Sequence, residues 1–164
     1  MIRRTVIAAL LTIALILPAI ARDFYWENPQ YLGGADSRFP LSATNGSSSA
    51  LLFQDVERND SDTGNIWLSL RVFSNGRWTS HDRFAGPFPY EGDVPSIASI
   101  SIDVRNTILV SAATAVNTVS VFVSRDLGAS FSETKLNGNT SAVLAPCVFV
   151  RSDGGYLLFA TRGG

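Results

Sequence analysis

Hydrophobic residues along most of the chain occur in short runs rather than with helical spacing. The runs are rich in β-branched and aromatic residues, and Asn-Gly, Asp-Gly and Gly-Gly pairs separate several of them. No segment after residue 21 keeps a 3.6-residue hydrophobic period, so the pattern favours antiparallel strands joined by hairpins. The predicted strands are residues 50–53, 66–73, 97–102, 107–112, 118–123, 147–150 and 156–161. We therefore expect an all-β fold.

The strands repeat in a fixed order. Pro40, Pro95 and Pro146 are separated by 55 and 51 residues, and each opens a unit of strand, turn and second strand. In the first two units a third strand follows, and it leads into a glycine-containing turn and an aromatic residue. Units of about 50 residues with about four short strands are typical of β-propeller blades. A β-sandwich is the alternative, but nothing in a sandwich requires this whole order to repeat.

The number of units is small for such a fold. The chain has room for about two and a half antiparallel four-stranded blades, whereas closed propellers typically have 4 to 8. The sequence therefore predicts a partial β-propeller and the N-terminal part of a longer protein, or a gene remnant. Self-assembly of several copies into a ring is a third alternative.

The first 21 residues have a different pattern. Two arginines precede an apolar run over residues 5–17, Pro18 ends the run, and small residues stand at 19 and 21. This pattern predicts a secretory signal peptide over residues 1–21, cleaved after Ala21. The run is shorter than the roughly 20 residues that span a bilayer, so no stable membrane span is expected after cleavage. Residues 22–164 would form one domain, secreted or located in the periplasm or at the cell surface.

The composition of the chain argues against several kinds of functional site. The formal net charge of −1 gives no indication of a nucleic-acid partner. The only cysteine, Cys147, lies in an apolar run and is predicted to be a buried strand residue. The only histidine, His81, lies in a polar, loop-like stretch, which gives little support to a Ser-His-Asp triad or a histidine-rich metal site. No metal or cofactor is expected.

One turn carries a recognisable motif. Ser124, Asp126, Gly128, Ser130 and Phe131 follow the pattern Ser-x-Asp-x-Gly-x-Ser-Phe. Asp126 can accept hydrogen bonds from backbone N–H groups within the turn, and Gly128 can adopt positive φ. The motif resembles the Asp-box, or BNR repeat, of sialidases (neuraminidases) and related propellers. The resemblance implies a structural turn on the outer rim of a blade, with the Phe131 ring packed between neighbouring sheets.

Three elements of the first unit resemble the sialidase site in the same order. Ser37-Arg38-Phe39-Pro40 is similar to the Arg-Ile-Pro motif of the first blade, and residues 50–58 resemble a second strand that ends in an arginine, here Arg58. Residues 61–66 resemble the Ser-Asp-x-Gly-x-Ile loop, in which the aspartate, here Asp62, is the acid/base. Arg58 follows Arg38 by 20 residues and Asp62 follows it by 24, as the family pattern implies.

The resemblance implies an exo-acting glycoside hydrolase that releases terminal sialic acid from glycoconjugates. Arg38 and Arg58 would bind the substrate carboxylate, as the planar guanidinium fork allows, and Asp62 would be the acid/base. The partner would be a sialylated glycan or another carbohydrate. The nucleophilic tyrosine, its glutamate and two further arginines come from later blades of the family, so this chain alone is expected to be inactive.

Several positions depart from the family pattern. Ser37 replaces an aromatic residue, Thr63 stands where Trp is frequent, and the turn at residues 74–78 keeps only part of an Asp-box. A non-catalytic Asp-box propeller that binds glycans or proteins at the cell surface is therefore the main alternative, and a pseudogene product without a stable fold is another. Asp93 is predicted to form a turn, and a position lining the central pocket of a propeller is the alternative.

Overall fold

The computed structural model describes residues 36–59, 62–115, 118–137, 143–151, 153 and 155–162. Within these ranges the chain forms ten strands and no helix. The strands are β1 (Ser37–Thr44), β2 (Ser48–Arg58), β3 (Thr63–Ser74), β4 (Arg77–Glu91), β5 (Ala98–Ile102), β6 (Ile108–Ala115), β7 (Thr118–Ser124), β8 (Ser132–Asn137), β9 (Val143–Val150) and β10 (Tyr156–Arg162). The predicted all-β fold is confirmed.

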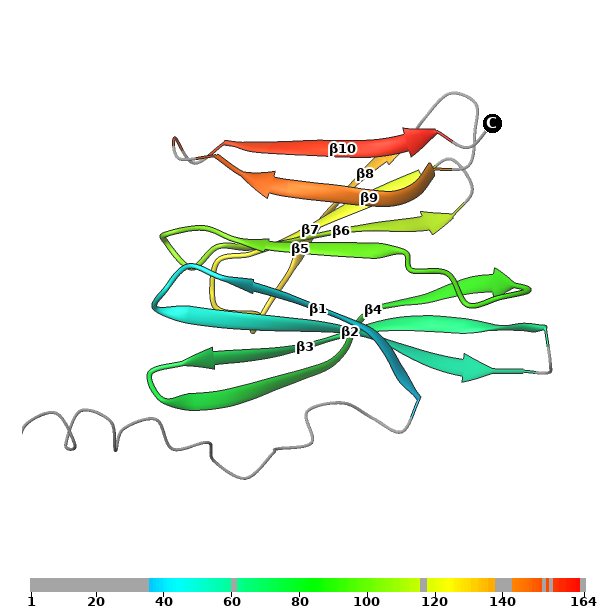
Figure 1. Cartoon of the computed structure of the whole chain (residues 1–164), viewed down its shortest axis with the longest axis horizontal. Coiled ribbons are helices and arrows are strands. Elements are labelled where there is room, and N and C mark those ends of the chain that lie inside the picture. Colours follow the sequence, from blue (N-terminus) through cyan, green and yellow to red (C-terminus); the bar gives the residue numbers. More distant parts are fainter. Residues whose placement is uncertain are drawn as a thin grey trace, which may run out of the picture. The chain divides into compact units, whose positions relative to one another are not determined.

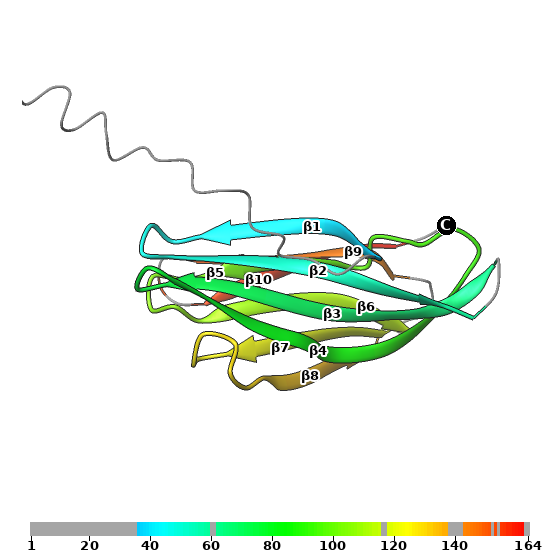
Figure 2. The ribbon, with the colours of Figure 1, turned by 90° about the horizontal axis from the view of Figure 1, so that it is seen from below.

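The strands form three antiparallel sheets in chain order. The first sheet is β1–β2–β3–β4, the second is β5–β6–β7–β8, and the third is the pair β9–β10. Figure 1 shows the sheets stacked one above the other. The hairpin turns that follow β1, β3, β5, β7 and β9 lie at one end of the stack, which we call the hairpin end (Figures 1 and 2). The ends of β2, β4 and β6 lie at the opposite end, which we call the crossover end.

Every predicted strand lies in or overlaps an observed one. β1 was expected only as the strand associated with Pro40, without bounds, and β4 and β8 were not predicted. β4 has two register shifts against β3 and contains Pro87 and Pro89, so its hydrophobic residues do not alternate regularly. Proline is tolerated in β4 because this strand lies at the edge of its sheet. β8 is also an edge strand, and its described side chains are exposed and largely polar. His81 lies in β4, so its assignment to a loop was wrong.

The core lies between the first and second sheets. Alternate residues of β2 and β3 are buried on one face of the first sheet, as a period of two requires for a strand with one covered face. Leu52, Ile66, Leu68 and Leu70 are at most 1 % exposed. They share a hydrophobic cluster with residues of β5, β6 and β7, among them Val110. Each fully buried Leu or Ile side chain contributes about 1.5–3 kcal/mol to the stability of the folded chain.

A polar junction ties the first sheet to the start of the second. Gln54 in β2 is 1 % exposed, yet both ends of its amide are hydrogen-bonded. Its Nε2 donates to the carbonyl of Pro95 at 2.8 Å, and its Oε1 accepts from the N–H of Ile97 at 2.8 Å. These bonds satisfy the hydrogen-bonding groups of the buried amide and hold the segment before β5 against β2.

The second sheet holds β9 in an equivalent way. The Ser111 hydroxyl donates to the carbonyl of Pro146 at 3.3 Å, and the Ser99 hydroxyl accepts from the N–H of Val148 at 2.9 Å. At both junctions, therefore, side chains of the preceding sheet bind the carbonyl of the proline that opens a unit and the N–H two residues later: one side chain at the first junction and two at the second. Pro95 and Pro146 occupy equivalent positions, as the spacing of the prolines predicted.

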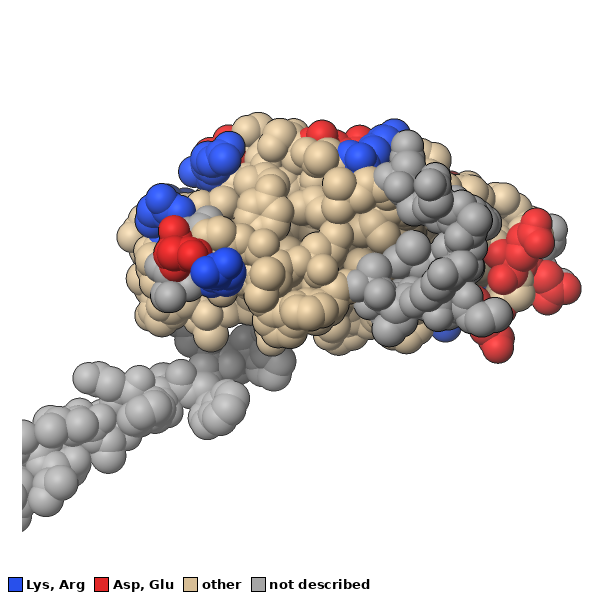
Figure 3. Space-filling model, turned by 90° about the horizontal axis from the view of Figure 1, so that it is seen from above, with Lys and Arg blue, Asp and Glu red and all other residues tan. Residues whose placement is uncertain are grey.

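The outward face of the third sheet is apolar. Phe149, Leu157 and Phe159 are 45–57 % exposed, and the two phenylalanine rings meet edge to face at 6.0 Å. Viewed from above, the middle of this face is largely uncharged and the charged residues lie around its edge (Figure 3). Cys147 pairs with Phe159 and is only partly buried, so the prediction of a buried cysteine in a strand was right about the strand and wrong about the burial. No described strand covers this face.

Candidate functional site

Arg38 and Arg58 lie on the same face of the first sheet. Arg38 in β1 pairs with Gln54, whose side chain points toward the second sheet, and cross-strand partners share a face. Arg58 follows Gln54 by four positions in β2, so it also points to that face. Both arginines are exposed: Arg38 lies in the edge strand β1, and Arg58 is the last residue of β2.

Asp62 lies at the same end, between β2 and β3. Its side chain is exposed and its carbonyl accepts a hydrogen bond of 2.6 Å from the N–H of Gly92, which follows β4. Next to it, the N–H of Asn59 donates to the carbonyl of Thr63 at 3.0 Å. The backbone around Asp62 is thus bonded across its own loop and to the segment after β4. The structure brings the three predicted site residues to one end of one sheet.

A buried tyrosine supports this loop. Gly64 pairs with both Arg58 and Tyr90, and a Cβ at Gly64 would lie 2.7 Å from Cε1 of Tyr90 and 2.4 Å from the carbonyl oxygen of Glu57. Only glycine fits between them. Tyr90 is 7 % exposed, and its hydroxyl has no hydrogen-bond partner in the part of the chain that the structure describes. Sequence reasoning missed Tyr90, because its contact with Gly64 depends on the register of β3 and β4.

A second group of charges lies on the other face at this end. Glu57 accepts a hydrogen bond from the indole N–H of Trp67 at 3.1 Å and is 3.5 Å from Nη1 of Arg83. The Arg83 guanidinium also lies 5.1 Å from the centre of the Trp67 ring, within the range of a cation–π contact. Since Glu57 and Arg58 are adjacent in β2, their side chains point to opposite faces. Glu57 is therefore directed away from the two site arginines.

Asp93 lies in the bend between β4 and β5, next to Gly92, whose φ is 75°. Its side chain is exposed. This placement agrees with the prediction that Asp93 forms a turn.

The turn with the motif of residues 124–131 joins β7 to β8 at the hairpin end. Asp126 Oδ1 accepts from the Ser124 hydroxyl at 2.8 Å and from the Ser130 N–H at 2.9 Å, and Oδ2 accepts from the Ser130 hydroxyl at 2.5 Å. The bond from the Ser130 hydroxyl, followed by those from the Ser130 N–H and the Ser124 hydroxyl, lowers the pKa of Asp126 to about 2. The N–H of Gly128 donates to the Ser124 hydroxyl at 2.7 Å. The expected network around Asp126 is present.

The same turn packs against the first sheet. Gly128 has a φ of 92°, and a Cβ there would lie 2.9 Å from side-chain carbons of Leu70 and His81. Phe131 stacks on Phe84 of β4, with ring centres 4.2 Å apart and planes inclined by 19°. Phe131 is partly buried, and its ring lies against the neighbouring sheet as expected. In this structure the motif residues close a turn and pack the second sheet against the first.

The two ends therefore differ in what they offer chemically. The crossover end has the exposed guanidinium groups of Arg38 and Arg58, which can bind a carboxylate, and several exposed carboxylates, among them Asp62, which can exchange a proton. The described residues contain no group of three or more His, Cys, Asp and Glu side chains placed to hold a metal ion. Among the same residues, no helix is long and apolar enough to span a membrane.

Comparison with known proteins does not assign the chain to a family. No protein-family model, curated protein or solved structure matches it. The resemblance to sialidases therefore rests on the residues themselves.

Proposed function

We propose that the chain is the N-terminal portion of a secreted, sialidase-like β-propeller whose intact form releases terminal sialic acid from glycoconjugates. Arg38 and Arg58 bind the substrate carboxylate. Asp62 protonates the leaving oxygen and then activates water. The nucleophilic tyrosine, with its glutamate, belongs to a later part of the intact protein. The 164-residue chain binds the substrate only weakly and does not hydrolyse it.

One observation carries this proposal: Arg38, Arg58 and Asp62 lie at the same end of the first sheet, with both arginines on one face. A sialoside presents a carboxylate close to its glycosidic oxygen. A site for it needs cations that can form paired hydrogen bonds, with a proton donor nearby. The motif residue Asp126 lies at the hairpin end, as a structural turn should in this proposal.

The stacking of the sheets supports the propeller. Successive units begin with β1, β5 and β9, and β5 contacts both β1 and β9. Equivalent hydrogen bonds join each unit to the next at Pro95 and Pro146. Such nearest-neighbour packing of repeated four-stranded sheets is how propeller blades are built. The proposed location is extracellular, periplasmic or at the cell surface. It depends on the signal peptide predicted over residues 1–21, which lies outside the described residues.

The alternative is a non-catalytic Asp-box propeller that binds glycans or proteins at the cell surface. One observation favours it. The best-matched motif, residues 124–131, closes a turn and packs one sheet against another, and a binding protein needs these structural contacts as much as an enzyme does.

Ligand binding by the chain itself tests the site. Saturation-transfer NMR with sialyllactose should show signals from the sialic acid residue that disappear when its carboxylate is methylated. Arg38→Gln and Arg58→Gln should each weaken these signals at least several-fold, because each removes a charged hydrogen-bond donor to the carboxylate. Arg77→Gln, at the hairpin end, is the matched control. Signals that survive methylation, or that respond equally to Arg77→Gln, would contradict the proposed site.

Catalysis is tested in two steps. The 164-residue chain should not cleave a fluorogenic sialoside, and turnover by it would refute the proposed division of the machinery. In the intact protein, Asp62→Ala should lower kcat by about 10²–10⁴-fold, the usual contribution of a general acid/base. An intact protein that binds sialosides without cleaving them would favour the non-catalytic alternative.

A further inference from the structure

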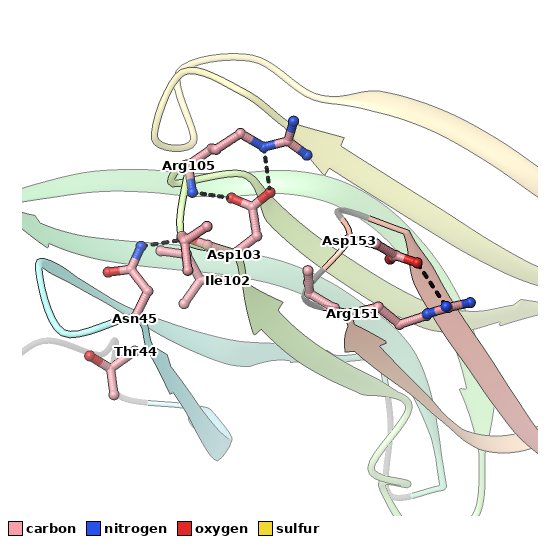
Figure 4. Close-up of a pocket in the computed structure, with 9 residues that line it drawn as sticks. Thr44, Asn45, Ile102, Asp103, Arg105, Arg151 and Asp153 are labelled. Carbon is pink, nitrogen blue, oxygen red and sulfur yellow. Dashed lines mark hydrogen bonds and ion pairs between the residues drawn. The ribbon is translucent and has the colours of Figure 1, made fainter.

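Three hairpin turns, one from each sheet, line an open cavity of about 460 Å³ at the hairpin end. The β1–β2 turn contributes Thr44 and Asn45, and the β5–β6 turn contributes residues 102–105. The β9–β10 hairpin contributes Val150, Arg151 and Asp153. Figure 4 shows that Arg105 and the Arg151–Asp153 pair reach the cavity from different turns. The volume lies in the range of small-ligand sites. The cavity shares no residue with the candidate site at the crossover end.

The first two turns are bonded to each other. The Asn45 side chain donates to the carbonyl of Asp103 at 2.6 Å and to Oδ1 of Asn106 at 2.8 Å. Its own Oδ1 accepts from the N–H groups of Ser47 and Ser48 at 3.0 and 2.9 Å. Asn45 therefore closes its own turn and binds the next one. This side of the cavity is built before any ligand arrives.

The carboxylates of the cavity are already engaged. Asp103 is 6 % exposed; its Oδ1 accepts from the N–H groups of Arg105 and Thr107 at 2.8 and 2.7 Å, and its Oδ2 lies 3.5 Å from Nε of Arg105. Burial raises the pKa of Asp103, but the bonds from Thr107 and Arg105 and the Arg105 charge lower it more, so the group is ionised. Asp153 likewise accepts from the N–H of Gly155 at 2.9 Å and pairs with Arg151 at 2.7 Å.

The guanidinium groups of Arg105 and Arg151, in contrast, have N–H donors that these carboxylates do not use. Each arginine carries five N–H donors, and in the described part of the chain each guanidinium contacts one carboxylate oxygen. Arg105 makes its contact through Nε, so both terminal nitrogens of its fork are left for another acceptor. The Arg105 and Arg151 side chains are 69 % and 56 % exposed. The formal charges of the lining cancel, so the cavity offers unused guanidinium hydrogen-bond donors rather than net positive charge, while its carboxylate acceptors are used within the turns.

Apolar side chains complete the lining. Ile102, Val104 and Val150 line the cavity, and Val104 is 84 % exposed although it is β-branched and apolar. We propose that this cavity binds a carboxylate that carries a small apolar group. The carboxylate pairs with Arg105 and Arg151, and the apolar group covers Val104. A free short-chain carboxylic acid and the C-terminus of a peptide that ends in an apolar residue both have this chemistry.

Titration of the 164-residue chain followed by amide NMR tests this proposal. The ligands are 4-methylpentanoate, its amide, and a Gly-Gly-Leu peptide with a free or an amidated C-terminus. The acid or the free peptide should bind saturably and shift resonances in the three turns, and the amides should not bind. If the free peptide binds at least tenfold more tightly than the acid, the ligand is a peptide end; the reverse order indicates a free acid.

Variants connect the binding to these residues. The double variant Arg105→Gln, Arg151→Gln should lose at least tenfold in affinity, whereas Arg125→Gln, an exposed arginine outside the cavity, should not change it. Val104→Asp should also abolish binding while leaving the fold intact, because Val104 is exposed. Absence of saturable binding, equal binding of acids and amides, or unchanged affinity in the double variant would overturn the proposal. None of these outcomes depends on sialoside binding at the crossover end.

Discussion

Two turns at equivalent positions in the repeat are built very differently. The β3–β4 turn contains only Asn75 and Gly76 between its strands, and both have positive φ, 52° and 74°. Such a turn matches the right-handed twist of the strands it joins. The β7–β8 turn spans the seven residues 125–131 and folds around the Asp126 carboxylate. Both follow the third strand of a four-stranded sheet.

The difference lies in what each turn touches. A Cβ on Gly76 would meet no atom within 4 Å, whereas one on Gly128 would meet Leu70 and His81 of the first sheet. Phe131 also reaches the first sheet, at Phe84. All residues of the longer motif are present in the β7–β8 turn, which packs against the preceding sheet. The short turn belongs to the first described sheet, and no described sheet precedes it. The motif therefore marks a packing contact between sheets as well as a turn.

The largest expected effect comes from filling the space at Gly128. Gly128→Ala should lower the free energy of unfolding by about 3 kcal/mol, because it combines a strained positive φ with overpacking against the fully buried Leu70. Gly76→Ala should cost only about 1 kcal/mol, since it adds the φ strain alone. Urea denaturation of both variants measures the difference. Equal losses would show that the β7–β8 turn does not depend on the first sheet.

Removing the aromatic ring of the motif should have a smaller effect. Phe131→Ala should lower the free energy of unfolding by about 2 kcal/mol, less than the 3–5 kcal/mol of a fully buried ring, because Phe131 is only partly buried. A double-mutant cycle with Phe84→Ala should give a coupling of about 0.5–1.5 kcal/mol for the stacked pair. Trp78→Ala combined with Phe84→Ala is the control and should show additive losses. A Phe84–Phe131 coupling near zero would contradict the proposed packing contact.

The smallest expected effect is the pH dependence of the motif. The pKa of Asp126 is about 2 in the folded chain, below its ordinary value of 3.8, because hydrogen bonds from Ser130 and Ser124 favour the ionised form. Its stabilisation is therefore fully present above a pH of about 4 and is lost as the pH falls through about 2. Carboxyl-carbon NMR should give a titration midpoint near 2 for Asp126. The midpoint should rise toward its ordinary value in a Ser124→Ala, Ser130→Ala variant, and an unchanged midpoint would contradict the assigned cause.

The hydrophobic pattern was sufficient for the strands with one covered face. Residues 66–73 alternate between the core and the outer face over the length of β3, so this strand could be predicted. β4 and β8 could not, because edge strands bury less and tolerate proline, polar residues and bulges. The candidate site shows the same division: Arg38, Arg58 and Asp62 were found from a motif, whereas Tyr90 was not, because its contact with Gly64 follows from strand register.

The sequence by itself determined the all-β class, the order of the first strands in each unit, and the turn chemistry of Ser124, Asp126 and Gly128. These properties depend on residues close together in the chain. Only the tertiary structure decided which face each side chain occupies and which turns meet. It showed that Arg38 and Arg58 share a face, that Cys147 is partly exposed, and that turns from three sheets bring Arg105 and Arg151 to one cavity. Such contacts join residues from different sheets, so no local pattern in the sequence encodes them.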